Sequence, residues 1–366
     1  MSSNYLDERL KRLEVDRPPI HRALVLGGDS PLGLEILSAL SARRIAARGL
    51  RSWQSVGVSA RPSEVHPSTG AAGSAVEAES PLEIEWSVGS LGDLQSLERA
   101  AWGCDAMICA QPWWREALPE AIEGLRAALA VAASAEMSRV VFVSSWWTVG
   151  EPGEAGRPAS EGDRILPGAG VGPEVEAAAF LELEALKAAG CGLPVIVVNP
   201  TWCLGPRGVP EGIEGWFRAC VEGRGRLAPR GRVNVIDARD AAAGIVEAAC
   251  SGREGRRYIL GGHGVEVEAL MGKVASVVGA RGPLGRAPDG VVEAIGRWSG
   301  RVASVSGGRG FLSAAEARQM VRRAEVSNER AARELGLRPR PLEETLQAAV
   351  EATVGGPKGA GGLLGS

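Results

Sequence analysis

A short apolar run, a glycine-bearing turn and a helical pattern follow one another early in the chain and restrict its fold more than any other feature. Residues 23–26 are all apolar, as in a buried strand, and residues 27–33 contain three glycines. Apolar residues then recur at helical spacing over 34–42. A strand, a tight glycine turn and a helix in this order are typical of the start of a nucleotide-binding unit.

The turn itself has the residue types that a pyrophosphate site needs. Gly27 permits a sharp reversal, and Gly33 permits close packing of the helix on the strand. A helix starting near Leu32 directs its free N–H groups and positive end at an anion. Ser30 carries a Cβ where the backbone would approach the phosphates, although its hydroxyl can bind them. With Gly28, these residues are the predicted phosphate site, and the alternative is a turn that only serves the fold.

Strands and helices alternate through the following part of the chain. Strands are expected near 54–59, 82–88, 105–110, 139–144 and 194–198, and helices over 94–101, 116–135 and 174–189. The runs 140–143 and 195–198 are continuously apolar, as expected for strands that are buried on both faces. The alternation therefore predicts an α/β protein with a Rossmann-like, doubly wound parallel sheet.

The remaining segments suggest a second, smaller domain. We expect strands near 233–237 and 257–260 to rejoin the parallel sheet. The predicted organisation has a dinucleotide-binding domain at 20–204 plus 231–262, a mostly helical C-terminal substrate domain at 205–230 plus 263–352, an N-terminal extension at 1–19 and a disordered Gly-rich tail at 353–366.

Composition excludes several classes of function. A net charge of −3 gives no support for a nucleic-acid partner. No apolar run approaches the ~20 residues of a membrane span. The six cysteines form no Cys-x-x-Cys pair and there are only three histidines, so no metal site is expected. Free thiols and a charged N-terminus unlike a signal peptide predict a cytoplasmic protein.

Several motifs resemble the extended short-chain dehydrogenases/reductases, the NAD-dependent epimerase/dehydratase family. The glycine turn matches their Gly-x-x-Gly-x-x-Gly with Ser30 in place of the middle glycine. Residues 89–93 resemble their Gly-Asp-Leu-x-Asp, and residues 141–145 resemble their catalytic-serine strand. The segments most similar to the hopanoid-associated sugar epimerase and dihydroflavonol-reductase-like members are 198–207, 234–262 and 327–344.

The resemblance implies a nicotinamide dinucleotide cofactor and an oxidoreductase- or epimerase-like activity. It assigns further cofactor contacts to Ser90, Leu91, Ala110, Ser144, Asn199 and Pro200. After the second strand, an acidic residue would bind the ribose of NAD, but this chain has Arg61, which can pair with a 2′-phosphate. This favours NADP(H) over NAD(H), unless Arg61 is an ordinary surface residue. Similar proteins also suggest a homodimer through helices 116–135 and 174–189.

The same comparison predicts a degenerate active site. Members carry Tyr-x-x-x-Lys after the serine strand, but the two tyrosines here are Tyr5 and Tyr258, far from that place. The family's spacing from Ser145 reaches Glu174, with Ala178 where the lysine belongs. The usual mechanism is thereby excluded. Ser145 and Glu174 are the remaining catalytic candidates, and their alternatives are a strand-end hydrogen bond and a helix cap.

Tryptophans follow the carboxyl ends of three predicted strands, where open α/β sheets bind ligands. They are Trp113, Trp114, Trp146, Trp147 and Trp202. They predict either a pocket for a small apolar or aromatic ligand or a filled active site. Three hypotheses for function follow: an NADP(H)-dependent enzyme with a nonstandard acid, an inactive dinucleotide-binding regulator, and a scaffold without cofactor.

Overall fold

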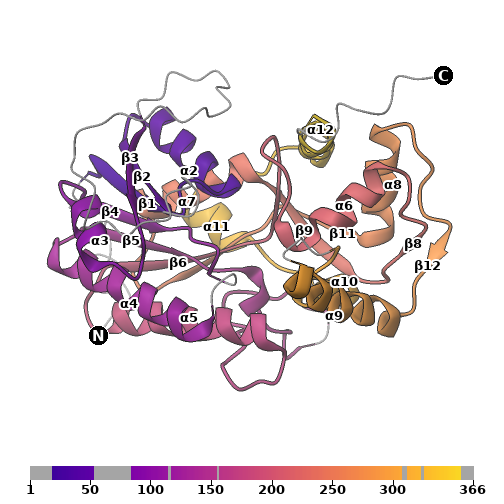
Figure 1. Cartoon of the computed structure of the whole chain (residues 1–366), viewed down its shortest axis with the longest axis horizontal. Coiled ribbons are helices and arrows are strands. Elements are labelled where there is room, and N and C mark those ends of the chain that lie inside the picture. The colour runs from indigo at the N-terminus through magenta and orange to yellow at the C-terminus, as the bar shows by residue number, and fades with distance from the viewer. Residues whose placement is uncertain are drawn as a thin grey trace, which may run out of the picture.

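Seven parallel strands form the central sheet in a computed structural model that describes residues 19–52, 84–113, 117–154, 156–306, 311–322 and 325–355. Their order is β10-β6-β5-β4-β1-β2-β3 (Figure 1). The strands are β1 (Arg22–Leu26), β2 (Ala46–Ser52), β3 (Glu85–Gly89), β4 (Ala106–Cys109), β5 (Arg139–Val143), β6 (Val195–Pro200) and β10 (Arg257–Leu260). The chain order reverses beside β1, where β4 and β2 lie on its two sides, so this is the topological switch point of the sheet, at which doubly wound sheets bind ligands.

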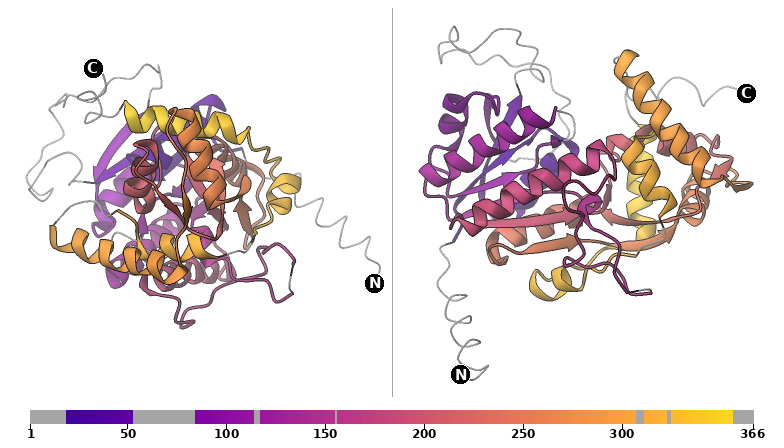
Figure 2. Two further views of the ribbon diagram at one scale, coloured as in Figure 1. Left: turned by 90° about the vertical axis from the view of Figure 1, so that its right-hand side faces the viewer. Right: turned by 90° about the horizontal axis from the view of Figure 1, so that it is seen from below.

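Helices cover both faces of this sheet (Figures 1 and 2). One face packs against α2 (Pro31–Ala42), α7 (Ala238–Ser251) and α11 (Glu329–Glu334). The other packs against α3 (Leu94–Ala101), α4 (Leu118–Ser134) and α5 (Pro173–Gly190). The predicted Rossmann-like, doubly wound parallel sheet is therefore confirmed.

The second strand lies earlier in the chain than predicted. It is Ala46–Ser52, which pairs with β1 on one side and β3 on the other, whereas residues 54–59 and Arg61 lie outside the described residues. The strand was missed because Arg48 and Gly49 interrupt its apolar pattern. Arg48 is nevertheless buried, since its guanidinium donates to the carbonyls of Ala100 and Trp102 and pairs with Glu85.

The strand near 233–237 does not rejoin the central sheet, so this part of the prediction was wrong. Strand β9 (Arg232–Asp237) instead lies between β11 (His263–Glu266) and β7 (Trp202–Leu204) in a separate sheet. Strand β7 starts immediately after β6, and it carries the chain out of the central sheet. The edge of β6 is then taken by β10, which leaves β9 to pair with β7.

The second sheet and the helices around it share one apolar core (Figure 2). The surrounding elements are η4 (Trp146–Thr148), η5 (Glu211–Ile213), α6 (Glu214–Val221), β8 (Leu227–Ala228), α8 (Val267–Val277), β12 (Gly285–Arg286), α9 (Asp289–Ser306), α10 (Ala314–Val321) and α12 (Leu342–Val354). Helix α12 includes the first two residues of the predicted tail, and residues 1–18 and 356–366 lie outside the described part.

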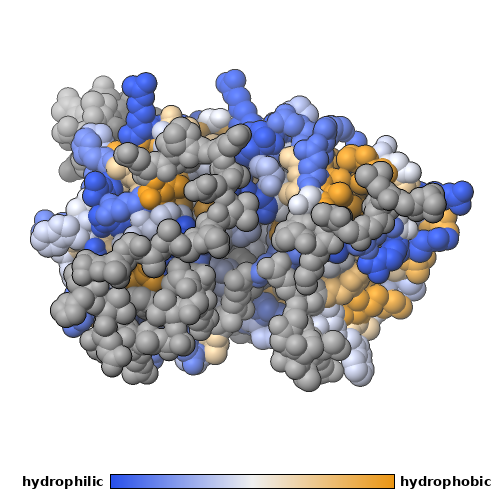
Figure 3. Space-filling model, turned by 45° about the horizontal axis from the view of Figure 1, so that its top comes forward, coloured by the Kyte–Doolittle hydropathy of each residue, from blue (hydrophilic) through white to orange (hydrophobic). Residues whose placement is uncertain are grey.

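The surface carries charged side chains interspersed with apolar ones, and Figure 3 shows apolar surface on the right-hand side of the face that it presents. Exposed apolar residues of the second half include Leu227, Val277 and Leu284. Among the described helices, none is long and apolar enough to span a membrane. Within the same residues, no group of three or more histidine, cysteine or carboxylate side chains is arranged to hold a metal ion.

Candidate functional site

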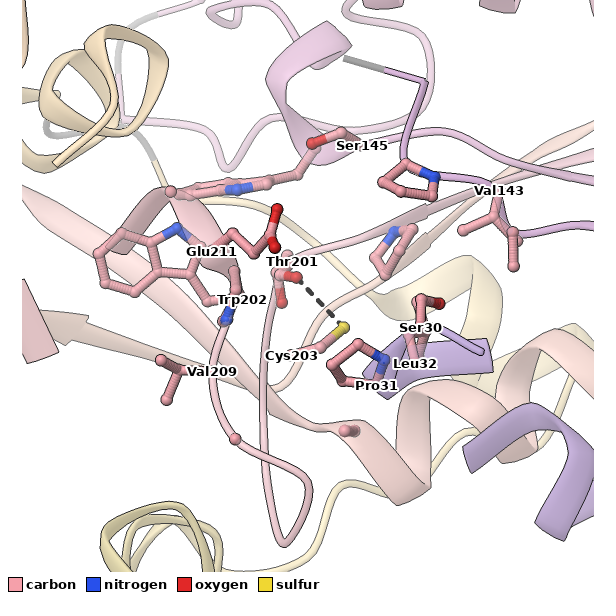
Figure 4. A pocket seen from close by; sticks show the side chains of 18 of the residues that line it. Ser30, Pro31, Leu32, Val143, Ser145, Thr201, Trp202, Cys203, Val209 and Glu211 are labelled. Carbon is pink, nitrogen blue, oxygen red and sulfur yellow. Dashed lines mark hydrogen bonds between the residues drawn. The ribbon is translucent and has the colours of Figure 1, made fainter. Parts of the chain in front are cut away.

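A cavity of about 150 Å³ lies at the carboxyl ends of β1, β4, β5 and β6, where the two halves of the chain meet. Figure 4 shows Pro31 and Leu32 on one side of it and Trp202 and Val209 on the other. A void of about this volume holds one benzene-sized ring in a protein interior. The position is the one at which doubly wound sheets bind ligands.

The glycines of the turn are required by close backbone approach. Gly27 has φ +73°, and a Cβ there would lie 2.8 Å from the Cα of Gln111. A Cβ on Gly33 would overlap the carbonyl oxygen of Gly27, and it would lie 2.9 Å from the Cα of Gly28. Gly28 in turn lies against Gly49 of β2, with 3.0 Å between a built Cβ and the Gly49 Cα. Side chains at these positions would collide with neighbouring backbone, so the turn can follow this tight path only while these residues are glycine.

Ser30, in the middle glycine's place, is the N-cap of α2. Its Oγ accepts a hydrogen bond from the Gly33 N–H at 3.0 Å and donates one to the Gly27 carbonyl at 2.8 Å. Pro31 has no N–H group. Among the described residues, the N–H of Leu32 has no partner. The first turn of α2 therefore offers an anion the N–H of Leu32, with the hydroxyl of Ser30 already engaged.

The other cofactor residues implied by the resemblance separate into two groups. Ala110, Ser144 and Pro200 line the cavity. Ser90 and Leu91 do not line it; Leu91 is buried against Gly124 of α4. Asn199 is fully buried and its amide donates to the Ser145 carbonyl, to Thr148 and to Glu182.

Asn199 belongs to a buried polar network beneath the cavity. One oxygen of Glu182 accepts hydrogen bonds from Ser144, Thr148 and Asn199 at 2.7, 2.6 and 2.7 Å. Its other oxygen lies 2.7 Å from Nε of Arg257 on β10. Burial lowers the pKa of Arg257, and the nearby Glu182 carboxylate opposes that shift. The network ties α5, η4, β6 and β10 together under the floor of the site.

The tryptophans divide between the cavity and the core. Trp146, Trp147 and Trp202 are buried and line the cavity. Trp113 is packed in the core, with its ring 6.0 Å from that of Phe142, and Trp114 lies outside the described residues. Three indoles thus line the cavity, as expected for a ligand pocket, and one fills the interior, as expected for a filled site.

Three charged residues of the cavity were not predicted from the sequence, namely Arg207, Glu211 and Glu316. Arg207 lines it and pairs with Glu35 of α2 at 3.1 Å. Glu316 of α10 also lines it, and its carboxylate accepts the Trp202 indole N–H at 2.6 Å. The only local signal at Glu316 was a Ser-x-x-Glu start of a helix, which Ser313 confirms by capping the Glu316 N–H. Its hydrogen bond with Trp202 joins residues far apart in the sequence, so no local pattern predicts it.

The chain matches no protein-family model. It is 30% identical over 220 residues to a putative dihydroflavonol 4-reductase of Synechocystis, a match that covers 57% of this chain and 63% of that protein, less than two thirds of its length. The chain is also similar in structure to a nucleoside-diphosphate-sugar epimerase from Pseudomonas aeruginosa, with 24% identity, a TM-score of 0.67 and coverage of 90% and 96% of the two chains.

A dTDP-glucose 4,6-dehydratase double mutant from Streptomyces venezuelae, solved with NAD bound, gives 19% identity and a TM-score of 0.64 over 92% of this chain and 98% of that one. The match thus extends over the sheet, both helical layers and the second half. The chain therefore has the fold of these nucleotide-sugar enzymes. The family resemblance predicted from the sequence is confirmed at this level.

The helix that follows β5 and η4 is α5. It starts at Pro173, one residue before the predicted start, and Glu174 lies in its first turn. Glu174 does not line the cavity, and it makes no cap bond; Glu176 accepts the loop N–H groups of Gly168 and Gly170 instead. One turn after Glu174, Ala178 faces a void of about 20 Å³ shared with Ser145 and Trp113.

Ser145 is the predicted catalytic candidate that the structure brings to the cavity. Its Oγ accepts the N–H of Trp147 at 3.3 Å and so caps the short helix η4. Within the described part of the chain, no tyrosine or lysine lines the cavity. Tyr258 is buried in β10, where its hydroxyl donates to Glu334. The cavity lining therefore combines three serines, three charged residues and an indole-rich wall.

Proposed function

We propose that the chain binds a nicotinamide dinucleotide and acts as an oxidoreductase- or epimerase-like protein that lacks the Tyr-x-x-x-Lys pair. The observation that carries this proposal is the continuity of the cavity. Its lining runs from Ser30, Pro31 and Leu32 at the start of α2 to Ser145 and Trp202 at the far side. A dinucleotide with its pyrophosphate at α2 would reach this space with its nicotinamide ring, which has the size of the void.

The residues present fit such a cofactor. Gly27, Gly28 and Gly33 let the turn pack tightly, because side chains there would collide with neighbouring backbone, and the N–H of Leu32 at the helix start has no partner among the described residues. When bound, the cofactor would supply a hydride donor or acceptor. Leu32 would hold the pyrophosphate, and the wall of Trp146, Trp147 and Trp202 would exclude water from the nicotinamide.

We further propose that NADP(H) is preferred over NAD(H), now on the basis of Arg51. In the register of β1 and β2, Leu26 pairs with Leu50, so Arg51 is the first residue beyond the end of β1, beside the glycine turn. Its guanidinium lies 3.6 Å from the ring centroid of Trp86, which holds it at this edge. An arginine here can pair with a 2′-phosphate, as was expected of Arg61.

Calorimetric titration with NADPH and NADH tests both parts of this proposal. We expect saturable binding of both nucleotides, with NADPH at least tenfold tighter because the arginine–phosphate pair contributes about 1.4 kcal/mol or more. Arg51→Ala should remove that preference and leave the NADH affinity within about twofold. Arg99→Ala, on α3, removes an arginine from another element of the same domain and is the control. Equal affinities in the unaltered protein would contradict the choice of NADP(H).

A second candidate function is an inactive dinucleotide-binding regulator. It is favoured by Ala178, which stands where the family's spacing places the lysine and faces a void of about 20 Å³ together with Ser145. The two functions differ in whether NADPH is consumed when carbonyl compounds are added to the loaded protein. A cytoplasmic homodimer through α4 and α5 is part of the same proposal. Sedimentation of the purified chain tests the dimer, since a monomer at all concentrations would exclude it.

A further inference from the structure

Glu316 places a carboxyl group in the wall of the cavity. The family resemblance assigns no function to this residue. Only 3% of its surface is exposed, and it lines the same space as Ser145. Trp202 Nε1 of β7 donates to its Oε2 at 2.6 Å. The indole of Trp147, on η4, lies close enough to lower the pKa of Glu316. Trp202 therefore anchors this carboxyl group at the cavity.

The position of this carboxyl group is fixed from its backbone outward. Ser313 caps α10 by accepting the Glu316 N–H at 3.2 Å. Gly212 of η5 lies so close that a Cβ on it would be 2.9 Å from Glu316 Cγ. The absence of a side chain at Gly212 thus leaves the space that the Glu316 stem occupies. A buried carboxyl held from three elements has few other positions to adopt.

The charge state of Glu316 depends on burial and on the two indoles. Burial raises the pKa of Glu316 to about 7, against the opposing effects of the Trp202 and Trp147 indoles. No charged neighbour is among the causes of this shift. Charged residues with described side chains on the elements packed against α10 are Arg232 and Asp237 on β9, Glu211 on η5, and Asp289, Glu293 and Arg297 on α9. Near neutral pH the group is therefore partly a neutral acid, which can donate a hydrogen bond.

Three other polar side chains of the cavity wall have partners outside it. Ser144 donates to Glu182 at 2.7 Å, Thr201 donates to Asn234 at 2.8 Å, and Arg207 pairs with Glu35. Proline, valine and tryptophan supply nine of the 23 lining residues, and Glu211 adds a second carboxyl group to the lining. A phosphorylated or otherwise anionic ligand would meet two carboxyl groups here, and Arg207 is already paired with Glu35. An uncharged ring with one oxygen matches both the walls and the volume.

We propose that Glu316 recognises the substrate's oxygen, with its neutral carboxyl group donating a hydrogen bond to the carbonyl of an uncharged, ring-sized ketone or aldehyde. This rests on the proposed function and adds the substrate class to it. Above pH 7 the carboxylate has no proton to donate and faces the carbonyl oxygen with like charge, so recognition weakens as the pH rises.

Acetophenone and ethylbenzene are a matched pair of probes that differ in the carbonyl oxygen. Their affinities for the full chain would be measured by tryptophan fluorescence across about two pH units on either side of 7. We expect the affinity ratio of acetophenone to ethylbenzene to fall about tenfold as the pH rises through 7, the equivalent of one hydrogen bond. The ratio removes effects of pH that act on any apolar ligand.

Two variants separate recognition by Glu316 from a structural role. Glu316→Gln has a donor amide at every pH, so its affinity ratio should not vary with pH. Trp202→Phe removes an indole hydrogen bond that lowers the pKa of Glu316, so the midpoint should move to higher pH. A constant ratio in the unaltered protein, the same pH dependence in Glu316→Gln, or no binding of either probe would overturn the proposal. NADPH titration of the same samples tests the dinucleotide site separately, because it does not depend on Glu316.

Discussion

Replacing Glu182 by leucine is expected to lower the free energy of unfolding by about 3 to 5 kcal/mol. Glu182 and Arg257 form an ion pair in which each side chain is at most 5% exposed. Without the carboxylate, Arg257 would be left as a buried charge, and Ser144, Thr148 and Asn199 would each lose an acceptor. The loss is large because the folded protein keeps Arg257 away from water. Without the Glu182 carboxylate, nothing offsets the free-energy cost of burying its charge.

Urea unfolding measures this loss, and Glu184→Ala is the matched control on the same helix. Glu184 pairs with Arg126 and Lys187, whose side chains are exposed, so the control should lose less than about 1 kcal/mol. The double replacement of Glu182 and Arg257 by methionine should recover part of the loss, because no isolated charge remains. A Glu182→Leu variant as stable as the Glu184→Ala control would show that the network is not needed for folding.

Gly33→Ala is expected to abolish dinucleotide binding and to destabilise the fold by about 3 kcal/mol. The added methyl group would overlap the Gly27 carbonyl and press on the Cα of Gly28. These contacts are with backbone, which cannot turn away as a flexible side chain can. Helix α2 would have to move away from β1, and the proposed phosphate site at its first turn would lose its geometry.

Gly272→Ala is the control, because it replaces a glycine by alanine at a position away from the proposed phosphate site. Gly272 lies inside α8 with nothing within 4 Å of a built Cβ, so alanine there should stabilise the protein by roughly 0.5 to 1 kcal/mol. Thermal unfolding and NADPH calorimetry on both variants give the comparison. Nucleotide binding by Gly33→Ala at the level of the unaltered protein would place the phosphate site elsewhere.

The parts of the fold that were predictable from the sequence are those with a local pattern. β5 and β6 are continuous apolar runs buried on both faces, and α5 starts at a glycine–proline pair, so each was placed within a residue or two. β2 was not, because Arg48 is neutralised by groups more than thirty residues away, which no local pattern indicates. β9 was misplaced because its partner depends on where β7 leads the chain.

The candidate site divides in the same way. Ser30, Gly33 and Ser145 followed from motifs, and the structure brings Ser30 and Ser145 to the cavity with Gly33 beneath them. Glu316 lies 114 residues from Trp202 in the sequence, so only the tertiary fold joins them. Glu174 was selected by spacing alone, and it lies in the first turn of α5, outside the cavity lining.

Energy transfer from tryptophan to bound NADPH tests the central claim most directly, namely that a dinucleotide at α2 reaches the indole-lined cavity. We predict saturable quenching of tryptophan emission with sensitised emission from the reduced nicotinamide, since three indoles line the space that the ring would enter. Trp202→Phe should reduce the transfer without abolishing binding. No saturable change with NADPH or NADH, together with an unchanged melting temperature, would contradict the account and leave a fold that serves only as a scaffold.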